Sequence, residues 1–321
     1  MNEMLDEVRK ICRELLEKKE VDAIVAWKKK DSEAREVLTV ISSPEEVEQI
    51  SLTPLSTSNP ARLVMEIAKD YKKLGVLAKG CDAMAIRQLI IEEKLDRNSL
   101  YIIGISCPGV VDYRKLKRDF GVVSAVEMNG EKLTVKNTDG EREVDFKDYI
   151  FENCLYCPHP TPVEYDVLVG EKREGYKGFE DIEDIENMSE EQRWEYWMKE
   201  FELCIRCHAC RSICPICYCT ECIVDPTNLA VSPMSTAEEK AAYPRILGRQ
   251  VSAKDNLVYH IIRVLHHAGR CAGCGECERA CPMELPLRKL ERKLEKVVRE
   301  YFGFNPEEES IPFPSKLDIM G

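Results

Sequence analysis

The chain has 321 residues, enough for about two domains, and its 58 acidic against 46 basic residues give a formal net charge of −12. This acidic balance argues against a nucleic-acid-binding protein, whose footprint is normally basic. The first residues lack the apolar core of a signal peptide, and no apolar run reaches transmembrane length. We therefore expect a cytoplasmic protein that binds no nucleic acid and does not insert directly into a membrane.

The first half of the chain alternates helical and strand patterns. Apolar residues between Met4 and Leu16 recur at helical spacing, and cap signals at Ser43-Pro44 and Asn59-Pro60 begin further helices, the second of which is expected to end at Gly75. Another helix is expected over 83–94. The expected strands are 21–27, 36–41, 76–79 and 100–106. This alternation predicts an α/β domain with a mainly parallel sheet and right-handed crossovers.

Two cysteines of this domain follow predicted parallel strands. Cys81 and Cys107 each come after the C-terminal end of a strand, the edge at which open α/β folds bind ligands. Cys154 and Cys157 add a C-x₂-C pair. Converging on that edge, the four would hold a cubane [4Fe–4S] cluster; the alternative is two core thiols and an unrelated pair. Cys12 lies on the apolar stripe of the first helix and is expected to be a core thiol.

The middle of the chain contains the expected domain boundary. Residues 121–146 read as a β-meander with turns at Asn129-Gly130 and Asp139-Gly140. The acidic run Glu180–Glu186 is expected to be solvated surface close to the boundary, so the predicted domains are 1–187 and 188–321. A capping box at Ser189-Glu-Glu-Gln192 begins a helix whose aromatic face is expected to pack a domain joint.

The second half contains two C-x₂-C-x₂-C-x₃-C-P runs, the spacing that holds cubane iron–sulfur clusters. The runs are Cys204, Cys207, Cys210, Cys214 and Cys271, Cys274, Cys277, Cys281. In two-cluster ferredoxins the fourth cysteine of each run serves the other cluster. The first cluster is therefore assigned to Cys204, Cys207, Cys210 and Cys281. The second is assigned to Cys271, Cys274, Cys277 and Cys214.

Other uses of these cysteines are less consistent with the spacing. Tetrahedral zinc needs only two C-x₂-C pairs, so the third cysteine and the C-P step are surplus for a zinc ribbon. Disulfides do not suit closely spaced cysteines in a chain without a secretion signal. We expect residues 188–321 to form an α+β, ferredoxin-like domain with two [4Fe–4S] clusters.

Further cysteines and histidines lie around the runs. Cys217, Cys219 and Cys222 would hold a fourth cluster if another residue supplied a ligand; structural thiols are the alternative. The expected helix 255–268 carries three histidines, predicted to be surface or packing positions rather than ligands: His260, His266 and His267. A final helix, 285–302, has an apolar stripe from Leu287 to Tyr301, and an extended tail is expected to follow it.

Several segments occur in the order found in a known family. They are Lys79-Gly-Cys81-Asp-Ala-Met-Ala-Ile, Tyr101-Ile-Ile-Gly-Ile-Ser-Cys107, the Cys154/Cys157 pair and Tyr165-Asp166-Val-Leu-Val-Gly170. Together they resemble the β subunit of coenzyme F420-dependent hydrogenases and formate dehydrogenases. The second half, with both runs and the extension through Cys222, is most similar to the formate dehydrogenase β subunit.

The resemblance covers about residues 10–310 and carries expectations of its own. It implies a flavin in the N-terminal domain and a cluster there, with Cys81, Cys107, Cys154 and Cys157 as ligands. Family members usually have an extra strand and a glycine-pair segment before the first helix. The chain starts at that helix, so it resembles an N-terminally shortened member.

We expect an iron–sulfur electron-transfer subunit of a multi-subunit anaerobic oxidoreductase. It would relay electrons between a catalytic subunit and a flavin or heterodisulfide-reductase-type partner, in a formate dehydrogenase, hydrogenase or heterodisulfide reductase type of complex. Its cofactors would be at least two [4Fe–4S] clusters, with third and fourth sites as above. FAD is a further candidate, but no FAD-binding or catalytic residue is assigned. The alternatives are a flavin-dependent β subunit that exchanges hydride with coenzyme F420 or a nicotinamide, and a zinc scaffold.

Overall fold

The structure is a computed structural model that describes residues 2–30, 34–220, 222–224, 236–237 and 252–313. The chain divides into two compact units. The first comprises Met1–Gly178 with the short segments Ala272–Cys274 and Ser310–Pro312. The second comprises Phe179–Cys271, Gly275–Glu309 and Phe313–Gly321. The domain limits 1–187 and 188–321 stay a prediction.

A five-stranded sheet in the order β2-β1-β3-β4-β8 is the centre of the first unit. Its strands are β1 (Ala23–Lys29), β2 (Glu36–Ile41), β3 (Leu74–Lys79), β4 (Leu100–Ile105) and β8 (Val167–Val169). All neighbours pair in parallel except β1 and β2, which are antiparallel. The predicted α/β architecture with a mainly parallel sheet is therefore confirmed for this part of the chain.

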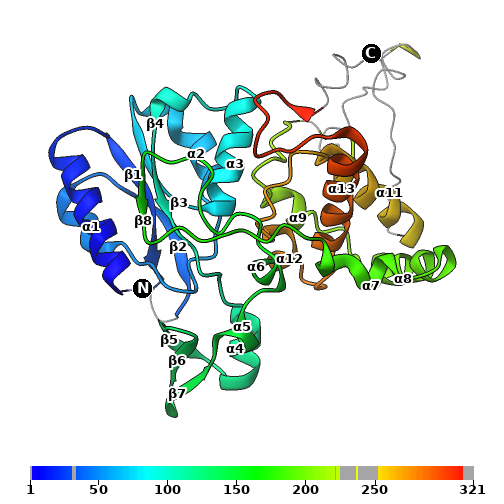
Figure 1. Cartoon of the computed structure of the whole chain (residues 1–321), viewed down its shortest axis with the longest axis horizontal. Coiled ribbons are helices and arrows are strands. Elements are labelled where there is room, and N and C mark those ends of the chain that lie inside the picture. The colour runs from blue at the N-terminus through cyan, green and yellow to red at the C-terminus, as the bar shows by residue number, and fades with distance from the viewer. Residues whose placement is uncertain (1, 31–33, 221, 225–235, 238–251, 314–321) are drawn as a thin grey trace. The chain divides into compact units, whose positions relative to one another are not determined.

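Helices cover both faces of this sheet, as Figure 1 shows for α1 on one side and for α2 and α3 on the other. Their bounds are α1 (Asn2–Glu17), α2 (Ala61–Ile67) and α3 (Gly80–Ile91), with 3₁₀ turns at η1 (Pro44–Gln49), η2 (Ala68–Asp70) and η3 (Arg97–Ser99). The apolar stripe of α1 packs onto Trp27 and Leu77 in one buried cluster. Cys12 is fully buried in this cluster, and burial raises the pKa of its thiol to about 12, as suits a core residue.

Gly75 does not end a helix, contrary to the expectation. The helical segment ends with the 3₁₀ turn Ala68–Asp70, and Gly75 lies inside β3 opposite Ile24. A Cβ atom at Gly75 would come within 2.8 Å of Ile24 Cγ1. The glycine therefore permits close packing between neighbouring strands, a use of glycine that a local cap pattern does not distinguish from a helix end.

The predicted β-meander is confirmed as a separate three-stranded antiparallel sheet in the first unit. Its strands are β5 (Val123–Asn129), β6 (Lys132–Asn137) and β7 (Gly140–Asp145). Tight turns at Gly130 and Gly140, both with positive φ, connect them. The short helices packed beside it are α4 (Tyr113–Phe120) and α5 (Phe146–Tyr149), and α6 (Glu152–Leu155) follows.

The second unit is a cysteine-rich helical region. Its elements are the 3₁₀ turn η4 (Glu180–Ile182) and the helices α7 (Glu183–Glu186), α8 (Glu190–Glu202), α9 (Ala209–Ser212), α11 (Ala253–His266), α12 (Glu276–Arg279) and α13 (Leu287–Phe302). No named strand lies among the described residues of this unit, so its α+β, ferredoxin-like nature stays a prediction. None of the described helices is long and apolar enough to cross a membrane.

The predicted capping box at the start of α8 is confirmed. Ser189 Oγ accepts from the Gln192 backbone N–H at 3.2 Å, and the Gln192 side chain accepts from the Ser189 N–H at 2.9 Å. The aromatic residues of this helix differ in burial. Phe201 is buried and stacks on His260, whereas Trp194 is 59% exposed.

Two expectations hold for most residues of their segments and fail at single positions. Glu180, Glu183 and Asp184 of the acidic run are exposed, and Leu287 and Val298 of the apolar stripe of α13 are buried. In the acidic run Glu180–Glu186, Asp181 is buried and accepts from Arg292 Nε at 3.0 Å. In α13, Arg292 is among the largest fully buried side chains, whereas Tyr301 of the predicted apolar stripe is 78% exposed. Ion pairs join the acidic run to basic residues of α13. Because the partners are distant in sequence, neither local charge nor apolar periodicity predicts the burial of Asp181 and Arg292. Of the predicted tail, Phe313 packs on Phe304, and residues 314–321 lie outside the described residues.

Candidate metal centres

Four cysteines of the first unit gather near the carboxyl edge of its sheet. Because β3 and β4 are parallel and in register, Lys79 opposite Ile105, the residues after both strands emerge at one edge. Burial raises the pKa of Cys107 to about 12, and the charge of Cys154 adds to the shift. Burial also raises the pKa of Cys81, as do Asp82 and, to a lesser extent, Cys157. The thiols of Cys81 and Cys107 therefore lie close enough to those of Cys157 and Cys154, respectively, for their charges to interact.

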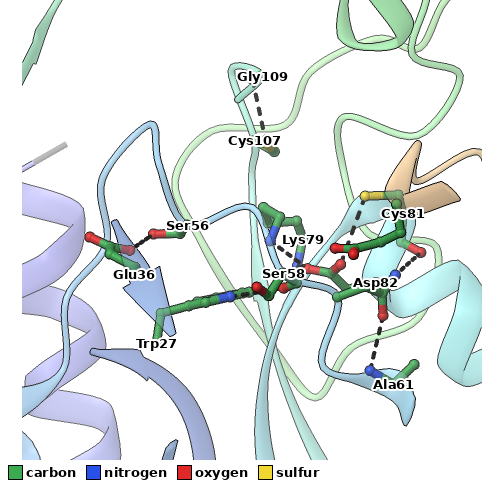
Figure 2. Close-up of polar contacts among 12 residues, drawn as sticks. Trp27, Glu36, Ser56, Ser58, Ala61, Lys79, Cys81, Asp82, Cys107 and Gly109 are labelled. Atoms are coloured by element: carbon green, nitrogen blue, oxygen red, sulfur yellow. Dashed lines mark hydrogen bonds and ion pairs between the residues drawn. The ribbon is translucent and has the colours of Figure 1, made fainter. Parts of the chain in front are cut away.

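A buried lysine, Lys79, lies near Cys81 and Cys107, and Figure 2 shows its surroundings. Lys79 Nζ lies 2.8 Å from Asp82 Oδ2 and 3.8 Å from the centre of the Trp27 ring. Burial alone would lower the pKa of Lys79, but Asp82, Cys81 and Cys107 raise it. A buried cation next to thiols favours their deprotonated form, the form that binds metal.

Close backbone packing holds the loop after Cys157 against the start of α3. A Cβ atom at Gly80 would lie 1.5 Å from the carbonyl oxygen of His159, so only glycine fits there. His159 itself is buried. The contact places the backbone that follows Cys157 directly over the backbone that precedes Cys81. It explains how a C-x₂-C pair distant in sequence reaches the strand-end cysteines.

In the second unit, Cys281 joins three cysteines of the first run. Cys204, Cys207, Cys210 and Cys281 line one small cavity together with Tyr259 and His260. Burial raises the pKa of Cys204 and of Cys210, and the charges of the other thiols in this group add to both shifts. The fourth cysteine of the second run thus lies with the first three of the first run.

The two runs fold into the same local conformation. Arg206 and His208, with φ of 50° and 60°, match Gly273 and Gly275, with φ of 67° and 70°. Each pair is followed by a single-turn helix, α9 or α12. Left-handed φ is unfavourable for arginine and histidine, so it is kept only where the surrounding structure requires it. The sequence repeat is therefore also a structural repeat.

Polar groups from α11 face the sulfurs of the first run. Tyr259 Oη lies 3.5 Å from Cys210 Sγ, and His260 Nε2 lies 3.4 Å from Cys204 Sγ. The Arg206 backbone N–H donates to Cys204 Sγ at 3.4 Å, and Arg263 donates to the Cys210 carbonyl at 3.2 Å. Hydrogen bonds to ligand sulfurs tune the reduction potentials of iron–sulfur clusters.

Cys214 lies beside Cys217 and His267. The sulfur atoms of the two cysteines and a ring nitrogen of His267 are all within 4.8 Å of one another. Burial alone would lower the pKa of His267, but Glu291 and Cys214 raise it to about 9. Of the other predicted ligands, Cys219 is exposed, whereas Cys222, Cys271, Cys274 and Cys277 are half-buried. The assignment of Cys214 to the second run stays a prediction.

Comparison with known proteins agrees with this cysteine pattern. Residues 71–184 match the family described as the C terminus of the coenzyme F420 hydrogenase/dehydrogenase beta subunit. The F420-dependent formate dehydrogenase subunit beta of Methanocaldococcus jannaschii is 26% identical, over 93% of this chain and 90% of that protein. The chain is therefore similar to beta subunits of coenzyme F420 hydrogenases and dehydrogenases.

Two further proteins were compared with this chain. The F420-dependent formate dehydrogenase 1 subunit beta of Methanococcus maripaludis is 24% identical, over 93% of this chain and 89% of that protein. A solved structure titled as the F420-reducing [NiFe] hydrogenase complex from Methanosarcina barkeri aligns with a TM-score of 0.39 and 18% identity. That alignment covers 51% of this chain and 63% of the other.

The segment that matches the family contains the four cysteines predicted to hold a cluster in the first unit: Cys81, Cys107, Cys154 and Cys157. Sequence reasoning missed the residues that surround the sulfurs. Lys79 and Asp82 stood inside the family motif and could have been singled out as an unusual charged pair beside a buried cysteine. Glu291 carried no local signal, and His267 was expected to be a surface or packing residue.

Proposed function

We propose that this protein is an iron–sulfur electron-transfer subunit of an oxidoreductase complex of the formate dehydrogenase or hydrogenase type. The observation that carries the proposal is the grouping of Cys281 with Cys204, Cys207 and Cys210 around one cavity. This is the crossed arrangement that the ferredoxin spacing requires. The complex type comes from the relatives, whose names describe formate dehydrogenase beta subunits.

The cysteine groups fit [4Fe–4S] clusters by their chemistry. Most thiols in each group are buried or half-buried, and Cys207 is the exposed exception. One cluster is assigned to Cys204, Cys207, Cys210 and Cys281 of the second unit. The next is assigned to Cys271, Cys274, Cys277 and Cys214. The ligands in the first unit are Cys81, Cys107, Cys154 and Cys157. When bound, such clusters accept and release electrons one at a time.

The residues of the chain hold the ligands and set their electrostatics. The same left-handed loop conformation occurs in both runs, as suits a tight loop that supplies three thiolates to one cluster. Tyr259 and His260 face two sulfurs of the first group, which stabilises negative charge on them. Lys79 does the same for Cys81 and Cys107 through its charge. Both features favour the reduced, more negative state of a bound cluster.

Iron and acid-labile sulfide measured in anaerobically purified full-length protein test this function. Cys281→Ser should remove about four irons from the total, because it removes one ligand of the cluster held by Cys204, Cys207 and Cys210. The cluster held by the run at Cys271 should keep its iron. Cys12→Ala is the matched control, since Cys12 is a buried thiol in an apolar cluster; its iron content should equal that of the parent.

Two results would contradict the proposal. One is an unchanged iron content in Cys281→Ser. The other is stoichiometric flavin in the native protein together with turnover of coenzyme F420 or a nicotinamide, which would favour the flavin-dependent alternative. Neither result involves Cys217 or His267.

A further inference from the structure

Three donor atoms in the second unit come closer together than cluster ligands do. In the part of the chain that the structure describes, Cys214, Cys217 and His267 form the one group of three His, Cys, Asp or Glu donors within 4.8 Å of one another. Cys217 Sγ lies 3.1 Å from His267 Nε2. Around one zinc ion, with Zn–S of about 2.3 Å and Zn–N of about 2.0 Å, donors are separated by roughly 3.5 Å. The spacing therefore suits a single ion.

A carboxylate orients the imidazole ring. His267 Nδ1 lies 2.7 Å from Glu291 Oε1, and both side chains are 2% exposed. Arg263 Nη1, also buried, lies 3.5 Å from the same carboxylate oxygen. Histidines that bind metals usually donate their other ring N–H to a carboxylate or carbonyl, which fixes the tautomer and directs the free nitrogen at the metal. The ring of His267 is held in this way.

The contact between His267 and Cys217 joins two donor types that zinc prefers. Nε2 of His267 lies 3.1 Å from Cys217 Sγ, and the carboxylate of Glu291 holds the opposite nitrogen of the ring. A metal ion that prefers mixed imidazole and thiolate ligands fits such a pair, and zinc is the common ion with this preference.

We propose that Cys217 and His267 bind one zinc ion, with Glu291 holding His267 in the binding orientation. Cys214 is the third donor of the group. The spacing of the runs assigns the thiol of Cys214 to the second cluster. Cys214 therefore adjoins both sites, and the zinc ligands proposed here are Cys217 and His267. The zinc site does not require the electron-transfer function.

Zinc, iron and acid-labile sulfide are measured together in the full-length protein, purified anaerobically and dialysed against buffer supplemented with zinc alone. The parent should hold one zinc per chain. His267→Gln and Cys217→Ser should lose it while keeping the iron of the Cys204 group. His266→Gln is the matched control, because His266 is the adjacent and exposed histidine of the same segment. It should bind zinc like the parent.

The role of Glu291 and the identity of the ligand atoms have separate readouts. Glu291→Gln should keep the site but weaken its zinc affinity by about 10–100-fold, the usual effect of losing such a carboxylate. X-ray absorption at the zinc edge of the parent should show nitrogen at about 2.0 Å beside sulfur at about 2.3 Å. This measurement remains decisive even if His267→Gln fails to fold.

Three outcomes would overturn the proposal. The first is an unchanged zinc content in His267→Gln. The second is a zinc spectrum that contains sulfur neighbours only. The third is a loss of iron and sulfide, rather than zinc, from His267→Gln, which would make His267 part of a cluster site instead of a single-ion site.

Discussion

The two units of the molecule have cores of different chemistry. The first unit buries a continuous apolar cluster formed by α1, β1, β3, β4 and β8. The second has two smaller clusters, one of which includes three buried cysteines, and it buries charged side chains from α11 and α13. Apolar burial stabilises a fold by itself, whereas thiols and paired charges contribute little unless metals and partners are in place. We therefore expect only the second unit to depend on metal for its stability.

Metal removal should have the largest effect and separates the units directly. Stripping the full-length protein with a chelator and an oxidant should expose the amides of α11 and α13 to hydrogen exchange, while those of β1, β3 and β4 stay protected. Metal binding contributes on the order of 10 kcal/mol to small metal-dependent folds. Equal loss of protection in both units would show that the apolar cluster of the first unit is insufficient.

Lys79→Met tests a buried ion pair in the first unit, a feature that the first unit shares with the second. The change leaves Asp82, 1% exposed, as an uncompensated buried carboxylate. We expect the unfolding free energy of the first unit to fall by about 3–5 kcal/mol, measured from the exchange of β3 amides. Lys79→Met with Asp82→Asn should cost less than the single change, because no buried charge is left unpaired.

The control for that experiment is an exposed ion pair in the same unit. Lys132 Nζ lies 2.7 Å from Asp145 Oδ1, and the two side chains are 47% and 57% exposed. Lys132→Met should leave the unfolding free energy nearly unchanged, because water and salt screen an exposed pair. A similar loss of unfolding free energy in the two lysine variants would mean that burial does not strengthen the contribution of the Lys79–Asp82 pair.

Glu295→Gln should have the smallest effect among the buried groups and concerns the charges of α13. Burial raises the pKa of Glu295, but Arg288 and Arg292 outweigh it and hold this pKa below its ordinary value. A carboxyl whose pKa is lower in the folded state stabilises the fold above its unfolded pKa of about 4.5, and this contribution is lost as the pH falls through the folded pKa.

The variant should therefore be less stable than the parent near pH 7, by about 1–2 kcal/mol, and the gap should close as the pH is lowered below about 4.5. Denaturant unfolding at several pH values, followed through the exchange of α13 amides, measures it. A gap that stays constant with pH would assign the loss to packing rather than to charge.

Features that depend on short stretches of chain could be predicted from the amino-acid order alone. The spacing of the two runs predicted the repeat that reappears as matching left-handed residues at Arg206 and Gly273. The predicted strands 76–79 and 100–106 implied that Cys81 and Cys107 would share a sheet edge, and β3 and β4 are indeed parallel and in register. Apolar periodicity, cap signals and turn pairs act over a few residues, so a short window of sequence contains all that is needed to recognise them.

The distant residues that face these cysteines could be identified only in the folded chain. His267 meets Cys217 across 50 positions and Glu291 across 24, and Arg292 meets Asp181 across 111. No local pattern encodes such pairs, because charged and polar residues of the same kinds are also common on exposed faces of helices. Burial and charge pairing arise when remote segments pack together, and they place Asp181, part of a run expected to be solvated, in the interior beside Arg292.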